Sequence, residues 1–454
     1  MADEQAPLTF HPDAKRNFDE KANALAASLT SNAPVFDDSQ GISVNPHVKA
    51  AFGKADILPD SSVWSQADHA GDETARYFDA GGQVFGLEGE KYLAFRRLAE
   101  SIQRTDGMRD TISLDTIIDL LTQWLRSTRT GKAQETATDF VLSKSRSLVG
   151  EYTVLMPLYQ LFIEEPFDLG NVLIRAVTEE EIDRWVSGQS KKNPEHAKSF
   201  EESGQRWKVK HQGQAAACMT LVAEPKRAYE VARREAEDAL AMLHAFSVGM
   251  LVPGAKCYWT LLGSEKVEEY TYFILEADDL KTGLSGLYRF RNSVGSLSKA
   301  LLAVLKSNGL DTASALLRAT KRSDFQERLV EALLLYSRAA VQDGLAEKLL
   351  YIIVALESML IRNDNEPIQQ NLGERLAFTV GGSVEERKAI IKAVKRAYEL
   401  RSRFMHHGRA IDDVKAMEAF MLYAYAFFEK VLRVVNIFQT RVAFLDALDN
   451  RKLA

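Results

Sequence analysis

An arginine and a pair of histidines lie close together near the C-terminus, and these residue types suit chemistry on a phosphate. They are Arg401, His406 and His407. An imidazole exchanges a proton near neutral pH, and a guanidinium binds a phosphate through two N–H groups at once. Cleavage of RNA without a metal needs a base for the 2′-hydroxyl, an acid for the leaving 5′-oxygen, and positive charge on the phosphorane. The three residues therefore predict a metal-independent ribonuclease site.

The spacing of these residues limits how they cooperate. Residues five apart are separated by about 140° around a straight helix, so Arg401 and His406 would not share a face. Gly408 is a stop signal because glycine adopts positive φ easily, and the helix dipole favours histidines in a last turn. We therefore expect the helix to end between Arg401 and His406. His406 would then turn toward the arginine, or toward the same site of a second subunit in a dimer.

Positive charge is concentrated around this motif. Residues 384–409 include eight basic and three acidic side chains, on a chain whose net charge is −6. Such an excess suits a phosphate backbone, although a solvated basic face that pairs with neighbouring carboxylates would have the same composition. The two histidines lack further metal ligands nearby, and the sequence contains no HExxH, CxxC or Walker-type loop. We therefore expect no metal and no cofactor.

The whole-chain composition is that of a globular protein long enough for two or three domains, with 454 residues of which 46% are hydrophobic. The acidic balance argues against non-specific coating of nucleic acid. Two cysteines, Cys218 and Cys257, are too few for a disulfide framework and fit a reducing compartment. The N-terminus lacks an apolar signal region, and no long uncharged apolar stretch occurs. We therefore expect a cytoplasmic protein with no membrane partner.

Hydrophobic periodicity divides the chain into three predicted parts: a mostly helical region at 1–145, an α+β region at 146–291 and a helical bundle at 292–454. The predicted fold class is α+β, mainly α. Helices are expected at 13–29, within 89–129, and at 225–246, 294–306, 324–340, 346–362, 384–405 and 412–448. Strands are expected at 152–158, 160–163, 171–177, 216–222, 255–262 and 268–274, with a solvated loop at 187–194.

Three ordered sequence blocks carry a family resemblance. They are Ala355–Leu360 (ALESML), Gly373–Ala377 (GERLA) and Tyr398–His406 (YELRSRFMH). Roughly the last 130 of the 454 residues resemble an Apea-like HEPN (higher eukaryotes and prokaryotes nucleotide-binding) domain. The resemblance implies a small helical bundle that dimerises to assemble a composite ribonuclease site, in which the family's RxxxxH motif corresponds to Arg401 and His406. The middle of the chain resembles the sensor-like portion found upstream of such domains.

The resemblance also suggests secondary site residues. Family members commonly place glycine directly after the catalytic histidine, whereas this chain has His407, so either histidine is a candidate. Glu357 would orient Arg401 through an ion pair from a neighbouring helix, or it would serve only in packing and capping. The remaining candidates for catalysis or RNA contact are polar or charged neighbours of the motif: Tyr398, Ser402, Arg403 and Arg409.

Two functional hypotheses follow from these residues and the resemblance. The leading one is a homodimeric endoribonuclease, dimerised through its C-terminal bundle, that acts as an antiphage, abortive-infection or toxin effector. Its partner would be RNA, with tRNA as one candidate, and its activating signal would be phage-derived. The alternative is a non-catalytic module whose basic helix end binds a nucleotide or RNA without cutting it. A purely helical scaffold is a third reading.

Overall fold

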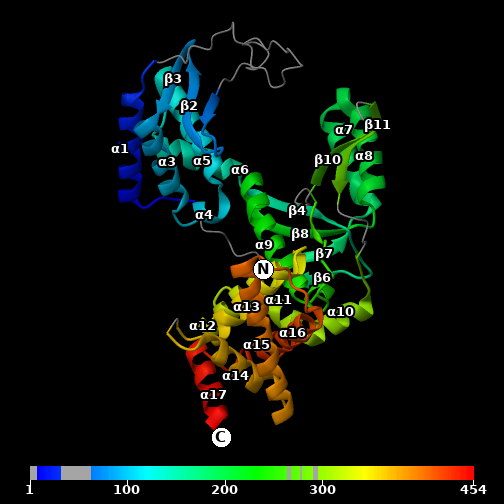
Figure 1. Ribbon diagram of the computed structural model, residues 1–454. Coiled ribbons are helices and arrows are strands. Elements are labelled where there is room, and N and C mark those ends of the chain that lie inside the picture. Colours follow the sequence, from blue (N-terminus) through cyan, green and yellow to red (C-terminus); the bar gives the residue numbers. More distant parts are fainter. Residues whose placement is uncertain are drawn as a thin grey trace. The chain divides into compact units, whose positions relative to one another are not determined.

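The computed structural model describes residues 8–31, 63–262, 267–276, 279–289, 295–363 and 365–453. The protein is mainly α-helical with small sheets, as the sequence predicted (Figure 1). It forms two compact units. Unit 1 comprises Met1–Thr153 and Thr220–Val231, and unit 2 comprises Val154–Met219 and Ala232–Ala454.

Unit 1 combines helices with a three-stranded antiparallel sheet. Its strands are β1 (Val63–Ala67), β2 (Glu73–Ala80) and β3 (Gln83–Glu88), in the order β1-β2-β3. Gly81 and Gly82 join β2 to β3, both with positive φ (69° and 82°), which suits a tight hairpin turn. The sequence analysis missed this sheet, because β2 buries residues in an irregular order rather than at alternate positions.

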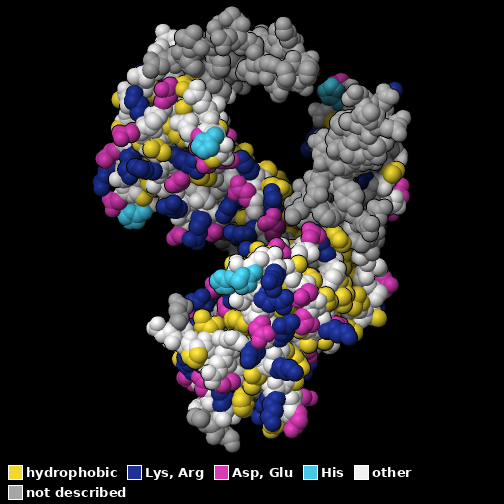
Figure 2. All heavy atoms as spheres, in the orientation of Figure 1, with side chains coloured by type: hydrophobic (Ala, Val, Ile, Leu, Met, Phe, Trp, Pro, Cys, Tyr) yellow, Lys and Arg dark blue, Asp and Glu magenta, His cyan; other side chains and the backbone are white. Residues whose placement is uncertain are grey.

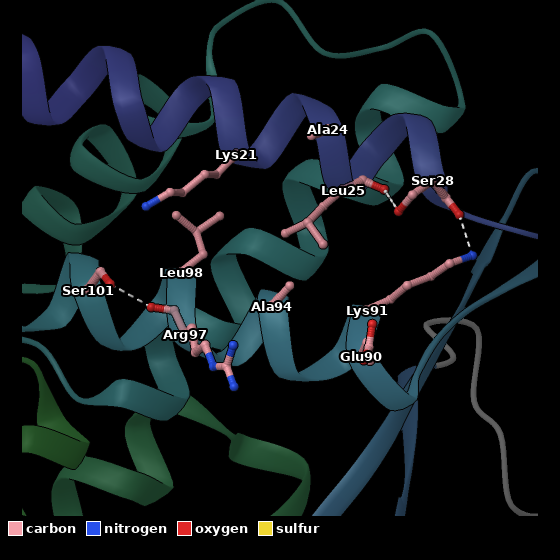
Figure 3. A pocket seen from close by; sticks show the side chains of 10 residues that line it. All are labelled: Lys21, Ala24, Leu25, Ser28, Glu90, Lys91, Ala94, Arg97, Leu98 and Ser101. Atoms are coloured by element: carbon pink, nitrogen blue, oxygen red, sulfur yellow. Dashed lines mark hydrogen bonds between the residues drawn. The ribbon is translucent and has the colours of Figure 1, made fainter.

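The helices of unit 1 are α1 (Pro12–Ser28), α3 (Gly89–Gln103), α4 (Met108–Thr111), α5 (Leu114–Arg129) and α6 (Ala137–Leu148). Helix α5 begins with a cap at Ser113, whose side chain accepts a hydrogen bond from the Thr116 N–H. A groove of about 490 Å³ lies between α1 and α3. Figure 3 shows that Lys91 closes one end of it, where its Nζ donates to the Ser28 carbonyl at 2.7 Å.

Unit 2 contains a five-stranded sheet, whose β6–β7, β7–β8 and β4–β9 pairs are antiparallel, and the long helix α9. The five-stranded sheet has the order β6-β7-β8-β4-β9, and two further pairs, β5 with β12 and β10 with β11, complete the strands among the described residues. Their bounds are β4 (Gly150–Tyr159), β5 (Leu161–Ile163), β6 (Phe167–Leu169), β7 (Val172–Ala176), β8 (Ala215–Ala223), β9 (Thr260–Leu261), β10 (Val267–Glu276), β11 (Asp279–Arg289) and β12 (Gly295–Leu297). The first residues of β4, the last of β8 and the start of α9 (Pro225–Ala245) belong to unit 1.

Two predictions for this region are wrong. The segment 187–194 is not a loop, because α7 (Glu179–Lys192) covers most of it and is started by a capping box between Thr178 and Glu181. Helix α8 (Ala197–His211) follows it. The expected strand at 255–262 is reduced to β9, since Lys256 and Cys257 bond to the helical side of unit 2: the Cys257 N–H donates to the Ala340 carbonyl at 2.8 Å.

The C-terminal part of unit 2 is a helical bundle. Its helices are α10 (Lys299–Leu305), α11 (Asp311–Arg318), α12 (Asp324–Ser337), α13 (Leu345–Leu360), α14 (Ile368–Val380), α15 (Val384–His407), α16 (Val414–Val434) and α17 (Arg441–Leu453), with short turns η3 (Lys306–Leu310) and η4 (Arg338–Val341). Helix α10 begins later than predicted, because β12 occupies Gly295–Leu297. One hydrophobic core joins the bundle to the sheet, from Met156 and Ile174 through Leu302 to Phe420.

The single helix predicted at 412–448 is in fact α16 and α17. Thr440 starts the second helix, because its hydroxyl accepts from the Ala443 N–H at 3.2 Å. The break also gathers three rings: Phe325 lies 5.6 Å from Phe438 and 4.9 Å from Phe444, centroid to centroid. The predicted domain boundary at 145/146 falls inside α6, and the one at 291/292 lies outside the described residues.

A buried arginine ties several of these helices together. Arg375 of α14 is only 3% exposed, yet each of its guanidinium N–H groups has an acceptor. The acceptors are the Leu360 carbonyl at the end of α13, both oxygens of Glu366, and both oxygens of Asp449 in α17. The hydrogen bonds from Arg375 hold the pKa of Asp449 well below its usual range. The arginine of the GERLA block therefore has a structural role, which is to join α13, Glu366 and α17.

We predict that Arg375→Met destabilises the protein by about 3–5 kcal/mol, because it removes a buried cation and deprives the half-buried Glu366 carboxylate and the Leu360 carbonyl of their donor. Urea unfolding followed by circular dichroism measures this loss. Arg328→Met is the matched control: Arg328 is half exposed and, among the described residues, pairs only with Glu331 one turn along α12, so its loss should cost below about 1 kcal/mol. Equal stability of the two variants would contradict the role assigned to Arg375.

Candidate active site on helix α15

Helix α15 runs without a break through the predicted motif. It starts with a capping box between Ser383 and Glu386 and continues to His407. Gly408 ends it in the left-handed conformation (φ 61°), where the Gly408 N–H donates to the Phe404 carbonyl at 2.9 Å. The expected stop at Gly408 is confirmed, but the expected helix end between Arg401 and His406 is wrong. No residue from 402 to 407 is a glycine or proline, so the ladder of backbone hydrogen bonds continues to the first glycine.

The unbroken helix separates the two motif residues. Arg401 and His406 lie about 140° apart around the axis and roughly 7.5 Å apart along it. Within the described part of the chain, no hydrogen bond, ion pair or ring contact joins Arg401 to either histidine. Both imidazoles are exposed, with ring centroids 6.5 Å apart. One copy of the chain therefore does not place Arg401 and His406 on the same phosphate.

Arg401 lies on the side of α15 that packs into the bundle. The buried stripe of this helix consists of Ile390, Val394, Ala397 and Leu400. By helical geometry Arg401 continues that stripe, about 20° from the direction of Ile390. Its guanidinium is one-third exposed and faces Glu357 of α13. The arginine therefore lies at the rim of the core, with part of its surface open.

The Glu357 carboxylate holds two residues of α15 at once. The Tyr398 hydroxyl donates to Glu357 Oε1 at 2.6 Å, and Arg401 Nη1 donates to the same oxygen at 3.4 Å. Burial raises the pKa of the Tyr398 phenol, and the hydrogen bond to Glu357 raises it further. Tyr398 therefore stays a hydrogen-bond donor, and its ring lies 5.9 Å from the Arg401 guanidinium. The suggested ion pair between Glu357 and Arg401 is present, and Tyr398 completes it.

Arg401 keeps most of its donors for another acceptor. A guanidinium has five N–H groups, and only one of those of Arg401 is engaged with Glu357, at a long distance. Arg375 in the same bundle, with all five engaged, is the contrast. Glu357 therefore orients Arg401 but leaves most of its N–H donors available. A guanidinium needs such available donors to bind a phosphate bidentately.

His406 lies on the opposite face of α15, in line with a row of exposed lysines. The shared positions are Lys388, Lys392, Lys395 and His406, all within about 40° of one direction and all exposed. No ion pair involves these three lysines within the described residues. We call this set the lysine face of α15. It points away from the buried stripe, so its charges meet solvent or an external anion.

The other charges near the motif are largely neutralised. Arg396 pairs with Asp413 at 2.9 Å and Glu399 at 3.1 Å, and Arg403 pairs with Asp412 at 3.2 Å. In Figure 2, dark blue and magenta side chains are accordingly mixed over the helices of unit 2. Ser402 and Arg409 are exposed, and Ser402 is on the side of the lysine face. The local charge excess is thus partly a paired surface and partly the free lysine face.

A groove follows the lysine face between α15 and α16. It measures about 610 Å³ and is lined by Lys392 and Lys395, by Arg396 with its partners Glu399 and Asp413, and by Tyr423 and four alanines: Ala389, Ala393, Ala416 and Ala419. The sequence analysis counted the basic residues but did not identify that three of them share a direction with His406. The sequence could have predicted this shared direction, because Lys388, Lys392, Lys395 and His406 are spaced by 4, 3 and 11 residues, which fits the helical period.

Comparisons with known proteins add no identification: no family model matches the chain, and neither a curated protein nor a solved structure matches it significantly. Among the described residues, no cluster of three or more His, Cys, Asp or Glu side chains is arranged to hold a metal ion. Within the same residues, none of the helices combines the length and apolar character that a membrane crossing requires.

We predict that Tyr398→Phe lowers the unfolding free energy by about 1.5–3 kcal/mol, because it removes a half-buried hydrogen bond to a charged carboxylate. Thermal denaturation measures the loss. Tyr423→Phe of α16 is the control, since the Tyr423 hydroxyl makes no hydrogen bond within the described residues. If both variants melt together with the wild type, the Glu357 carboxylate does not depend on Tyr398.

Proposed function

We propose that the protein is a metal-independent endoribonuclease of the HEPN type, with its active site at the end of α15. One observation carries the proposal: α15 presents Arg401 with spare donors on one side and the lysine face leading to His406 on the other. The lysines suit the backbone of a single-stranded RNA, while the imidazole and guanidinium supply the proton transfer and the charge stabilisation.

The geometry of α15 favours a site shared by two copies of the chain. Because Arg401 and His406 of one chain diverge by about 140°, a phosphate bound by one Arg401 is better placed to meet the His406 of a second copy. In this dimer, one imidazole takes the proton of the 2′-hydroxyl, and the imidazole of the other copy returns a proton to the leaving 5′-oxygen. Arg401 stabilises the negative charge that develops on the phosphorane.

His406 is the proposed catalytic histidine, and His407 is the second candidate. His406 shares the direction of Lys388, Lys392 and Lys395, whereas His407 is turned about 100° further around the helix. Glu357 and Tyr398 are proposed as positioning residues, because they contact Arg401 and do not face the lysines. Ser402, Arg403 and Arg409 are proposed contacts to RNA at the rim.

The biological setting follows from the HEPN resemblance. We infer a cytoplasmic antiphage, abortive-infection or toxin effector that cleaves cellular RNA, with tRNA as one candidate, after a phage-derived signal. The residues before the bundle would restrain or trigger it. The alternative, a regulatory module that binds RNA or a nucleotide without cleaving it, also uses the lysine face. Binding with intact RNA after prolonged incubation would favour that alternative.

We predict that His406→Ala lowers the rate of RNA cleavage at least 100-fold and that Arg401→Ala lowers it about 100-fold. Cleavage by the wild-type protein should be insensitive to EDTA. Gel analysis of end-labelled RNA measures the rate, and an all-deoxy oligonucleotide should stay intact. His407→Ala tests the second histidine, and Arg433→Ala of α16 is an exposed-arginine control. If both Arg401→Ala and His406→Ala cut like the wild type, the assigned site is wrong.

A mixing experiment tests the shared site. Excess His406→Ala protein, equilibrated with a fixed amount of wild type, should suppress activity, because mixed dimers contain only one of the two imidazoles. Activity that stays proportional to the wild-type protein present would rule out a shared site. The His406→Ala protein should still bind RNA, since its lysine face is intact, so that loss of cleavage is separated from loss of binding.

A further inference from the structure

A second concave site lies in unit 2, away from α15. It is a cavity of about 560 Å³ between α9, the end of α12 with η4, and the segment 256–260 that precedes and enters β9. None of the residues that line it comes from α13 to α17. Its volume is in the range typical of small-molecule sites. The groove between α1 and α3 is a weaker candidate, because its Lys91, Ser28 and Ser101 side chains already bond to the protein's own carbonyls (Figure 3).

The walls of this cavity are rich in flat rings. Tyr159 comes from β4, Tyr258 and Trp259 from the segment before β9, and His244 from α9. His244 Nε2 lies 2.7 Å from the Trp259 carbonyl, which only accepts, so this nitrogen carries the proton. Burial lowers the pKa of His244 to about 4, so the ring is neutral at pH 7. The four rings together form a surface suited to a planar group.

Two of the charged groups that line the cavity are already paired. Lys256 Nζ lies 2.6 Å from Asp343, and the Glu237 carboxylate accepts from Arg233 at 2.9 Å. These pairs leave two others. Asp238 on α9 has no hydrogen bond or ion pair within the described residues, although it is half-buried, and burial raises its pKa. The Arg338 guanidinium in η4 likewise has no ion pair within that part of the chain.

The two remaining charges have opposite signs and do not pair with each other. A half-buried carboxylate that is left without a partner costs free energy, which a bound cation would offset. A ligand that carries only an anionic group would satisfy Arg338 and leave Asp238 unpaired, and a ligand with only a cationic group would do the reverse. The charges of the cavity are therefore complementary to a zwitterion.

We propose that this cavity binds a small zwitterion with a planar ring, namely an aromatic amino acid or a short peptide that contains one. Its ammonium group pairs with Asp238, its carboxylate pairs with Arg338, and its ring lies against Trp259 and Tyr258. The proposal is independent of the ribonuclease activity, since it concerns a different part of unit 2 and is tested by binding alone.

Titration calorimetry on the full-length protein tests the proposal with four phenyl probes and with AMP, an anion that carries a planar base. Phenylalanine and phenylalanylglycine carry both charges, phenethylamine lacks the carboxylate, and 3-phenylpropionate lacks the ammonium group. We expect saturable binding of a zwitterionic probe, at least about tenfold tighter than either truncated probe, because each lost contact is a hydrogen-bonded charge pair. The affinities of phenylalanine and phenylalanylglycine show whether the cavity prefers a free amino acid or a short peptide. Tighter binding of AMP than of both zwitterions would overturn the proposal.

Two variants link the binding to the named residues. Arg338→Ala should abolish the preference for the zwitterion over phenethylamine while phenethylamine still binds, and Asp238→Asn should abolish the preference over 3-phenylpropionate. Binding of the truncated probe shows that each variant is folded. Arg328→Ala, on α12 but outside the cavity, should leave all affinities unchanged. Unchanged preferences in Arg338→Ala and Asp238→Asn, or no saturable binding of either zwitterion to the wild type, would reject the site.

Discussion

The buried guanidinium of Arg375 is the interaction on which the C-terminal bundle depends. It joins the end of α13, through the Leu360 carbonyl, to Glu366 before α14 and to Asp449 of α17. A charge that is only 3% exposed is tolerable because every donor has an acceptor and two carboxylates balance it. Glu357, whose carboxylate contacts Tyr398 and Arg401, lies one turn before Leu360 on the same helix.

Helix α15 carries functional candidates on two faces, which differ in whether their charges are paired. Toward α13, Arg401 is held by Glu357 and Tyr398, with several donors left open. On the opposite side the lysine face, which ends at His406, has no carboxylate partner in the part of the chain that the structure describes. A helix keeps these groups apart because its backbone hydrogen bonds fix the angle between successive residues. The chemistry proposed for the motif therefore follows from how two such helices meet, rather than from one chain alone.

The cavity and the candidate active site share one packed core. Helix α12 borders the cavity, α12 packs on α13, and α13 carries Glu357. The same hydrophobic core continues from the sheet through both helices. The helices that border the cavity and the helix that carries Glu357 therefore belong to one close-packed interior.

The sequence by itself determined the features that depend on neighbouring residues. The Ser113 cap, the long helix α9, the start of α15 and its stop at Gly408 all arise from hydrogen bonds and side-chain spacing within a few residues. It also identified Arg401, His406 and Glu357 as candidates. The tertiary structure decided which groups meet. Tyr398 and Arg401 contact Glu357, which lies 41 and 44 residues away in the sequence. Phe438 and Phe444 pack on Phe325 where the single predicted helix is divided into two. Arg375 binds Asp449 at a separation of 74 residues. Such contacts depend on how helices pack, which local periodicity does not encode.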